Sequence, residues 1–312
     1  MDIANIIYQI SSLLVLMVVG VVLGKKNVIS EQTAAGMDGL IMKLALPALI
    51  VVSMDREYSP ERLEISLLLI LTSILAHFAA IALVELWGKK TSKKAPQLGT
   101  LQFVTVFGNV AYIGLPVANA VMGSDGLFYA AMFCLPFNFF LFGYGLFVMK
   151  RDSKVNLKVV LKNPGMIASF LGIFIFVANL DLPGILQQPL SLAGGLAIPL
   201  SLLTVGSRIG RMHLSELFRP MDIWIVTALR MLVFPLTLLL ILSRLTDNHY
   251  LIAIPVIIFG TPVAMAAGPF TSNFGGDPLL ASKAVALSNA LAALIMPLVI
   301  WIMATFVLGG IL

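Results

Sequence analysis

The chain has 312 residues, of which 59% are hydrophobic and 11% are charged, and its net charge is +5. A soluble domain carries about 25% charged residues, so this chain has too little charge to cover a soluble surface and is too apolar to be disordered. Its mean hydropathy of +1.01 indicates a polytopic membrane protein. The apolar stretches are continuous rather than alternating, which favours spanning helices over a β-barrel.

Ten apolar runs follow one another along the chain, most of them close to the roughly 20 residues that a helix needs to cross a bilayer. They are residues 4–24, 34–53, 64–87, 98–122, 126–149, 164–180, 190–208, 222–243, 250–274 and 279–308. Glycine, proline and polar residues interrupt the fourth and ninth runs. We therefore predict an all-α polytopic membrane protein with ten transmembrane helices, of which helices 4 and 9 are broken.

Lys and Arg are distributed unequally between the two sides of this arrangement. One set of alternating loops holds 15 of the 20 basic residues and the other holds 3, while Lys43 and Arg230 lie inside runs. Loops rich in Lys and Arg stay in the cytoplasm. The sequence therefore predicts a multi-pass protein of the plasma (inner) membrane with both termini outside. The positive charge is explained by topology, so no nucleic-acid partner is expected.

The two halves of the chain share landmarks at nearly one offset. The pairs are Pro47 and Pro199, Gly108 and Gly260 (each 152 positions apart), and Asn138 and Asn289 (151 positions apart). We predict a first five-helix repeat over residues 1–150, a cytoplasmic basic linker over 151–163 and a second repeat over 164–312. Because five is odd, the second repeat enters the membrane from the opposite side. Such inverted repeats are typical of secondary carriers.

The breaks in the fourth and ninth runs are built from glycine and proline. The fourth run holds Gly108-Asn109 and Gly114-Leu115-Pro116, and the ninth holds Gly260-Thr261-Pro262 and Gly268-Pro269. Proline has no N–H and clashes with the preceding turn, and each glycine costs a helix about 1 kcal/mol relative to alanine. Unwound backbone persists in a membrane only where it is buried in protein or lines a wet cavity.

Two broken helices that meet would aim N-terminal half-helix ends at the membrane midplane. These ends carry free N–H groups and positive dipole charge, which suit an anion. Asn109 can add an amide donor and Thr261 a hydroxyl. We therefore expect the substrate at this crossing; the alternative is a pair of proline-kinked helices that hold no ligand.

The motifs Leu44-Ala45-Leu46-Pro47-Ala48-Leu49-Ile50 and Gly108-Asn109 with Gly114-Leu115-Pro116 resemble the auxin efflux carrier family. That family includes the PIN-FORMED auxin transporters and bacterial carriers, and it is related to the bile acid/sodium symporters. The resemblance implies a bacterial member with a scaffold from spans 1, 2, 6 and 7. It also implies a transport domain from spans 3–5 and 8–10, in which helices 4 and 9 cross and an organic carboxylate moves by an elevator-like shift.

The family's crossing amide in the first half carries over to Asn109. Thr261-Pro262 stand where a matching Asn would be sought in the second half, which departs from the two-amide pattern of auxin carriers. The long central loop of many plant members is also missing. Substrate identity is therefore not carried over from the resemblance.

Other polar residues inside the runs have two readings each. Lys43 either neutralises a substrate carboxylate or reaches the interface, and Arg230 either binds a carboxylate or bonds the carbonyls of the breaks. Asn138 and Asn289 either line the cavity or coordinate an ion, or they form hydrogen bonds between helices. The predicted substrate-binding residues are Gly108, Asn109, Val110, Tyr112, Pro116, Gly260, Thr261, Pro262, Asn138, Asn289, Lys43 and Arg230. The predicted hinge or break residues are Pro47, Pro199, Gly114, Gly268 and Pro269.

We expect a secondary-active transporter of a small organic anion, a carboxylate, and not an enzyme. The sequence has no HExxH, GxSxG or Walker A motif, and its single cysteine is Cys134, so neither a cofactor nor a metal is expected. The partners are the anion and the lipid bilayer, with H⁺ or Na⁺ as candidate coupling ions and a homodimer as a candidate assembly. The alternatives are a cation-coupled symporter of the bile acid type, a channel or an intramembrane enzyme.

Overall fold

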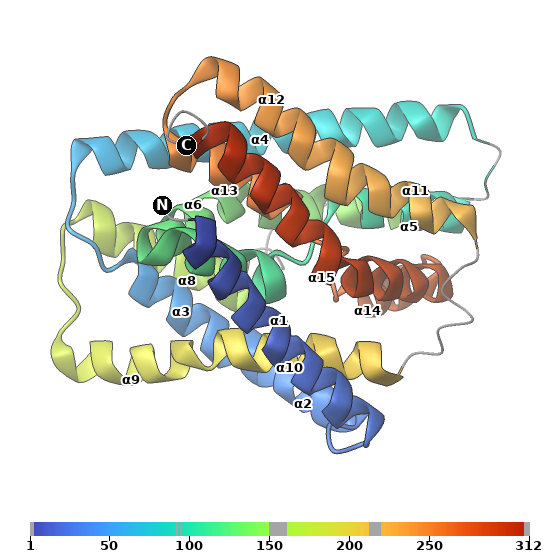
Figure 1. The fold of residues 1–312 in the computed structure, drawn as a ribbon, viewed down its shortest axis with the longest axis horizontal. Coiled ribbons are helices and arrows are strands. Elements are labelled where there is room, and N and C mark those ends of the chain that lie inside the picture. Colours follow the sequence, from blue (N-terminus) through green and yellow to red (C-terminus); the bar gives the residue numbers. More distant parts are fainter. Residues whose placement is uncertain (1–2, 92, 94, 150–160, 212–219, 309–312) are drawn as a thin grey trace.

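The computed structural model describes residues 3–91, 93, 95–149, 161–211 and 220–308, and the regular structure of this part is helical (Figure 1). Most of the predicted linker 151–163 lies outside the described residues. The elements of the first half are α1 (Ile3–Lys25), α2 (Glu31–Leu40), η1 (Ile41–Ala45), α3 (Leu46–Met54), α4 (Pro60–Lys89), α5 (Ala95–Val106), η2 (Val110–Gly114) and α6 (Leu115–Met149). Those of the second half are α8 (Pro164–Val177), α9 (Gly184–Gly195), α10 (Ala197–Arg211), α11 (Met221–Ala228), η4 (Leu229–Val233), α12 (Phe234–Leu245), α13 (His249–Phe259), α14 (Ala267–Phe274) and α15 (Pro278–Leu308).

Helices cover the ten predicted runs, and six helical stretches of the described part are long and apolar enough to cross a membrane. They are Glu31–Met54, Pro60–Lys89, Val110–Met149, Gly184–Arg211, Met221–Leu245 and Pro278–Phe306. Ser11–Lys25, Pro164–Val177 and His249–Phe259 are shorter apolar helices. The predicted fourth and fifth runs meet inside α6 at Gly123, whose φ of 65° and ψ of −160° break the helix. The helical class is thus confirmed, while the count of ten spans and the inverted repeat stay predictions.

Three π-helical turns accompany prolines inside the apolar runs. The segments η1, η2 and η4 each end two residues before a proline, at Pro47, Pro116 and Pro235. A proline ring clashes with the carbonyl four residues earlier, and a wider turn moves that carbonyl aside. Pro47 and Pro116 therefore widen a continuing helix, whereas Pro199 lies in the first turn of α10, after the interruption at Leu196.

Glycines allow α1 to pack directly on the backbone of α10. Gly20 and Gly24 on α1 and Gly206 and Gly210 on α10 each form a G-x-x-x-G pattern. A Cβ added to Gly20 would lie 2.5 Å from the carbonyl oxygen of Leu203, and one added to any of the other three would also overlap the facing backbone. Small residues of this kind let membrane helices approach closely. The two patterns explain why the first and seventh runs are joined in the fold.

The helices form two groups of neighbours, which we call the first and the second group. In Figure 1 most of the first group lies in the lower part of the view and most of the second in the upper part, while α14 of the second group lies level with α3. In the first group, α1 and α2 contact α10, α9 contacts α3 and α10, and α8 packs on α3. In the second group, α4, α6 and α12 surround α13, while α11, α14 and α15 pack beside α5. The breaks at η2 and after α13 lie in the second group, where aromatic rings such as those of Phe107, Phe133 and Phe259 are buried around them.

Candidate functional site at the helix crossing

Two interrupted helices cross at the centre of the second group. The first stops at Val106 and resumes at Val110, and the other stops at Phe259 and resumes at Ala267. Between these ends the two chains run antiparallel, with a bridge between Gly108 and Val263. The N–H of Asn109 donates to the carbonyl of Pro262 at 2.7 Å, and that of Ala264 donates to the carbonyl of Phe107 at 3.2 Å. Each break thus provides hydrogen-bond partners for part of the backbone of the other break.

The register of this crossing differs from the offset found in the sequence. The two hydrogen bonds are related by a shift of 155 positions in the chain. The two donors, Asn109 and Ala264, are 155 positions apart, and so are the two acceptors, Phe107 and Pro262. The sequence offset of 152 instead pairs Asn109 with Thr261. Within the crossing, the structural counterpart of the amide is therefore an alanine.

The side chain of Asn109 is buried and held from α15. Its Nδ2 donates to Oδ1 of Asn289 at 3.1 Å, and Nδ2 of Asn289 donates to the carbonyls of Val263 at 3.1 Å and Val285 at 2.8 Å. The N–H of Val263 donates to Oγ of Ser288 at 3.0 Å. Asn289 and Ser288 therefore fasten both strands of the crossing to one helix. This matches the reading of Asn289 as an interhelical hydrogen-bond partner.

Arg230 is buried behind the crossing, with an exposed fraction of 2%. Its Nη1 donates to the carbonyls of Thr105 at 3.0 Å and Val106 at 2.7 Å, at the C-terminal end of α5. Its Nε donates to the carbonyl of Pro262 at 3.3 Å, and its Nη2 to Oγ1 of Thr261 at 3.4 Å. Among the described residues no carboxylate pairs with it. Arg230 thus bonds the carbonyls of the breaks, the second of its two predicted readings.

A cavity of about 180 Å³ lies on the other side of the crossing, and we call it the crossing cavity. Five predicted substrate-binding residues line it: Gly108, Asn109, Val110, Tyr112 and Asn138. Its remaining wall includes Ala264, Met265, Ala266 and Phe270 from the second break, and Met42, Leu46 and Ile50 from the second run. No described residue that lines it carries a charge. Gly108 separates the cavity from Arg230, because a Cβ there would lie 2.6 Å from Cζ of the guanidinium.

The remaining predicted residues lie outside the lining of the crossing cavity. Thr261 is buried and its hydroxyl donates to the carbonyl of Ile258 at 2.7 Å, while the carbonyl of Pro262 accepts the bonds described above. Lys43 is exposed on the protein surface, which fits the interfacial reading of its side chain. Those outside the lining are Pro116, Gly260, Thr261, Pro262, Asn289, Lys43 and Arg230.

Sequence reasoning missed Ala264, Met265 and Ala266. They directly precede Ala267, where α14 begins, and Gly268-Pro269 fall in its first turn. Proline is favoured in the first turn of a helix, so the pair Gly268-Pro269 was a signal for a helix start. Applied here, that rule would have moved the predicted site from residues 260–262 to residues 264–266.

Two helix starts face the crossing cavity with amides that bond no carbonyl among the described residues. In the first, the earliest N–H to bond is that of Ile113, to the carbonyl of Asn109 at 3.0 Å, so the amides of Val110 and Ala111 precede any intrahelical bond. In the second, the N–H of Ala267 bonds the carbonyl of Ala264 at 3.0 Å, after Met265 and Ala266. Free amides and dipole charge at helix starts favour an anion.

Tyr112 connects the crossing cavity to charged residues of α2 and α10. Its hydroxyl donates to Oδ1 of Asp38 at 3.0 Å, and Nη2 of Arg208 donates to Oδ2 of the same carboxylate at 2.6 Å. One carboxylate thus joins the two groups of helices. In the described part of the chain, no three His, Cys, Asp or Glu side chains lie together as a metal site would require.

Comparison with known proteins adds the family to this geometry. A family model described as membrane transport protein matches residues 5–159 and 151–300, which together span most of the chain. The chain belongs to this family. An uncharacterized transporter of Methanothermobacter thermautotrophicus is 23% identical over 290 residues, covering 92% of this chain and 95% of the relative. An uncharacterized transporter of Methanocaldococcus jannaschii is 28% identical over 203 residues, covering 62% of this chain and 65% of the relative.

The family decides several predictions. It is the auxin efflux and PIN-like family, so the resemblance is confirmed at this level, as is the prediction of a transporter and not an enzyme. A multi-pass protein of a lipid bilayer with a small-molecule substrate is likewise confirmed. Bacterial membership, the relation to bile acid symporters, the domain boundaries and the site residues stay predictions.

Proposed function

We propose that the protein is a secondary-active carrier that moves a small organic anion, a carboxylate, through the crossing cavity. The observation that carries the proposal is the combination of two helix starts facing an uncharged cavity with a buried arginine directly behind Gly108. A cavity of this kind attracts negative charge without a cationic side chain in contact with the ligand.

The charges around the crossing support a monovalent anion. Each helix end carries about half an elementary charge, positive at the start and negative at the end. The ends of α5 and α13 together amount to roughly one negative charge, which the guanidinium of Arg230 offsets. The starts of η2 and α14 remain, with roughly one positive charge between them. One carboxylate group neutralises that charge.

The size and lining of the crossing cavity support a ligand with an apolar body. Its volume of about 180 Å³ leaves room for a small organic anion. Side chains such as Leu46, Ile50, Phe137 and Phe270 make up much of the wall, so a hydrocarbon portion would be buried there. The amide of Asn109 supplies a directional polar contact at one end.

The two groups of helices support alternating access. The first group corresponds to the predicted scaffold of spans 1, 2, 6 and 7, in which α1 and α10 pack backbone to backbone through glycines. The crossing belongs to the second group, which corresponds to the predicted transport domain. The crossing cavity extends to Asn163 and Gly165 at the start of α8, on the side of the basic loops. We propose that this is the cytoplasmic side and that both termini lie outside.

The experiment that tests the proposal is uptake of labelled carboxylates into proteoliposomes by the wild type and by Asn109→Ala. Asn273, which is exposed on α14, gives the matched control Asn273→Ala. Loss of the cavity amide is expected to weaken substrate binding by about 1–3 kcal/mol, or roughly 5- to 150-fold in Kd, while Asn273→Ala leaves it unchanged. Equal transport kinetics in the two variants would refute the assignment of the site to Asn109.

A further inference from the structure

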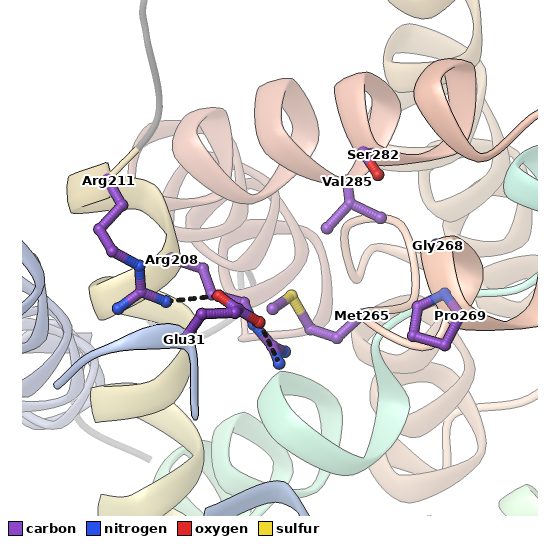
Figure 2. Close-up of a pocket in the computed structure, with 8 residues that line it drawn as sticks. All are labelled: Glu31, Arg208, Arg211, Met265, Gly268, Pro269, Ser282 and Val285. Carbon is purple, nitrogen blue, oxygen red and sulfur yellow. Dashed lines mark hydrogen bonds and ion pairs between the residues drawn. The ribbon is translucent and has the colours of Figure 1, made fainter. Parts of the chain in front are cut away.

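A second cavity of about 360 Å³ lies between α2, α10, α14 and α15, and we call it the vestibule (Figure 2). Glu31, Arg208 and Arg211 form one wall, and Gly268, Pro269 and Ser282 lie opposite. In contrast to the crossing cavity, it contains ionised side chains. Its arginines end α10, next to a basic loop, which is the predicted cytoplasmic side.

Two arginines of the vestibule bind the same carboxylate. Oε1 of Glu31 accepts from Nε of Arg208 at 3.3 Å and from its Nη2 at 3.2 Å, and Oε2 accepts from Nη2 of Arg211 at 2.7 Å. Figure 2 shows the carboxylate lying between the two guanidinium groups. The arrangement is therefore already a carboxylate-binding site, and its occupant comes from the chain itself.

The arginines are fixed, whereas the glutamate is exposed. Arg208 also bonds the carboxylate of Asp38 at 2.6 Å, and Nη1 of Arg211 donates to the carbonyl of Ile29. The exposed side-chain fractions are 18% for Arg208 and 21% for Arg211, against 68% for Glu31. Both guanidinium groups thus keep a second anchor when Glu31 swings into water, and an exposed ion pair contributes little stability.

The vestibule adjoins the crossing cavity at one side chain. Met265 lines both cavities. Methionine is unbranched with three rotatable side-chain bonds, so it can move between alternative positions at low cost. A ligand that leaves the crossing cavity past Met265 would enter the space in front of Arg208 and Arg211.

We propose that the vestibule is a second carboxylate site, which the transported anion occupies on the cytoplasmic side of the crossing cavity. In the absence of ligand, the carboxylate of Glu31 occupies this site. The incoming carboxylate replaces that of Glu31, so the net charge of the site does not change. The proposal rests on the proposed function for the identity of the anion. Binding at the vestibule can nevertheless be measured without transport.

The test is calorimetric titration of the purified full chain with the monocarboxylate butyrate at constant ionic strength, in an Asn109→Ala background that weakens the crossing cavity. Glu31→Gln removes the internal competitor, and we expect Kd to fall by up to about fivefold, the fold-change for losing an exposed ion pair. Arg211→Gln is expected to raise Kd at least tenfold, since it removes a charge-assisted bond. Glu64, exposed on α4, gives the control Glu64→Gln, which should not change Kd.

Equal affinities in the Glu31→Gln and Glu64→Gln variants would overturn the proposal, as would tighter binding of inorganic phosphate than of butyrate. If the Asn109→Ala background does not fold, the same comparison of Glu31→Gln with Glu64→Gln in the otherwise wild-type chain tests the vestibule. Failure of carboxylate transport with vestibule binding intact would reject the proposed function alone. Transport with a vestibule insensitive to Glu31→Gln would reject the second site alone.

Discussion

Gly108 should be among the least replaceable residues of the protein, and Gly108→Ala tests the geometry of the crossing. The added Cβ would overlap Nη2 of Arg230 and lie 2.6 Å from its Cζ. Carbon atoms in contact are normally about 3.5–4.0 Å apart. The guanidinium must therefore move by roughly 1.5–2 Å, or the crossing strands must separate.

The cost of that movement follows from the bonds that Arg230 makes. Shifting the guanidinium lengthens its bonds to the carbonyls of Thr105 and Val106, now 3.0 and 2.7 Å, and to that of Pro262, now 3.3 Å. A hydrogen bond to a charged group contributes about 1.5–3 kcal/mol. Loss of two such bonds amounts to about 3–6 kcal/mol, or a fall in melting temperature of roughly 5–15 °C.

The assay is thermal unfolding of the purified protein in detergent, followed by size-exclusion chromatography with tryptophan fluorescence detection. The matched control is Gly268→Ala, because Gly268 also lies at a break but a Cβ there would be 3.4 Å from its nearest neighbour, Oγ of Ser282. This control should melt at or slightly above the wild-type temperature, since alanine favours a helix. Equal melting temperatures for the two variants would refute the close approach of Arg230 to Gly108.

The hydroxyls of Ser201 and Thr204 are buried on α10 without a hydrogen-bond partner in the described structure, so Thr204→Val should raise stability by about 1 kcal/mol. Unfolding midpoints of Thr204→Val and wild type check this, and a lower midpoint for the variant contradicts it. In a Cys134→Ala background, cysteine at Ser59 should react with an impermeant maleimide in intact cells, and cysteine at Thr91 should not. The opposite labelling would reverse the proposed orientation.

The class of the protein and the positions of its breaks could be read from the sequence, because both depend on local composition. A low share of charged residues leaves a chain of this length no way to cover a soluble surface. Glycine and proline interrupt a helix wherever they stand, so the breaks at Gly108 and Gly260 were expected from the residues themselves. Asn109, directly after the first break, lies at the crossing, where its N–H bonds the carbonyl of Pro262.

The lining of the cavity depended on tertiary structure. In a soluble helix the apolar stripe identifies the buried face, but these helices are apolar all round, so the sequence does not mark which face meets protein and which meets lipid. Lys43 and Arg230 both lie inside apolar runs, yet one is exposed and the other is buried behind the crossing. The rotation of each helix about its axis, which is set by contacts with distant segments, places Lys43 at the surface and Arg230 in the interior.

The crossing register was also decided in three dimensions. Thr261 matches Asn109 at the offset of the repeat, but in the antiparallel crossing Asn109 bonds Pro262, and its structural counterpart, the donor of the other bond, is Ala264. Helix ends shift by a few residues according to what satisfies their free carbonyls and amides, here Arg230 at one end and the facing strand at the other. Composition therefore determined that two helices break, and long-range hydrogen bonds determined which residues of each break face the cavity.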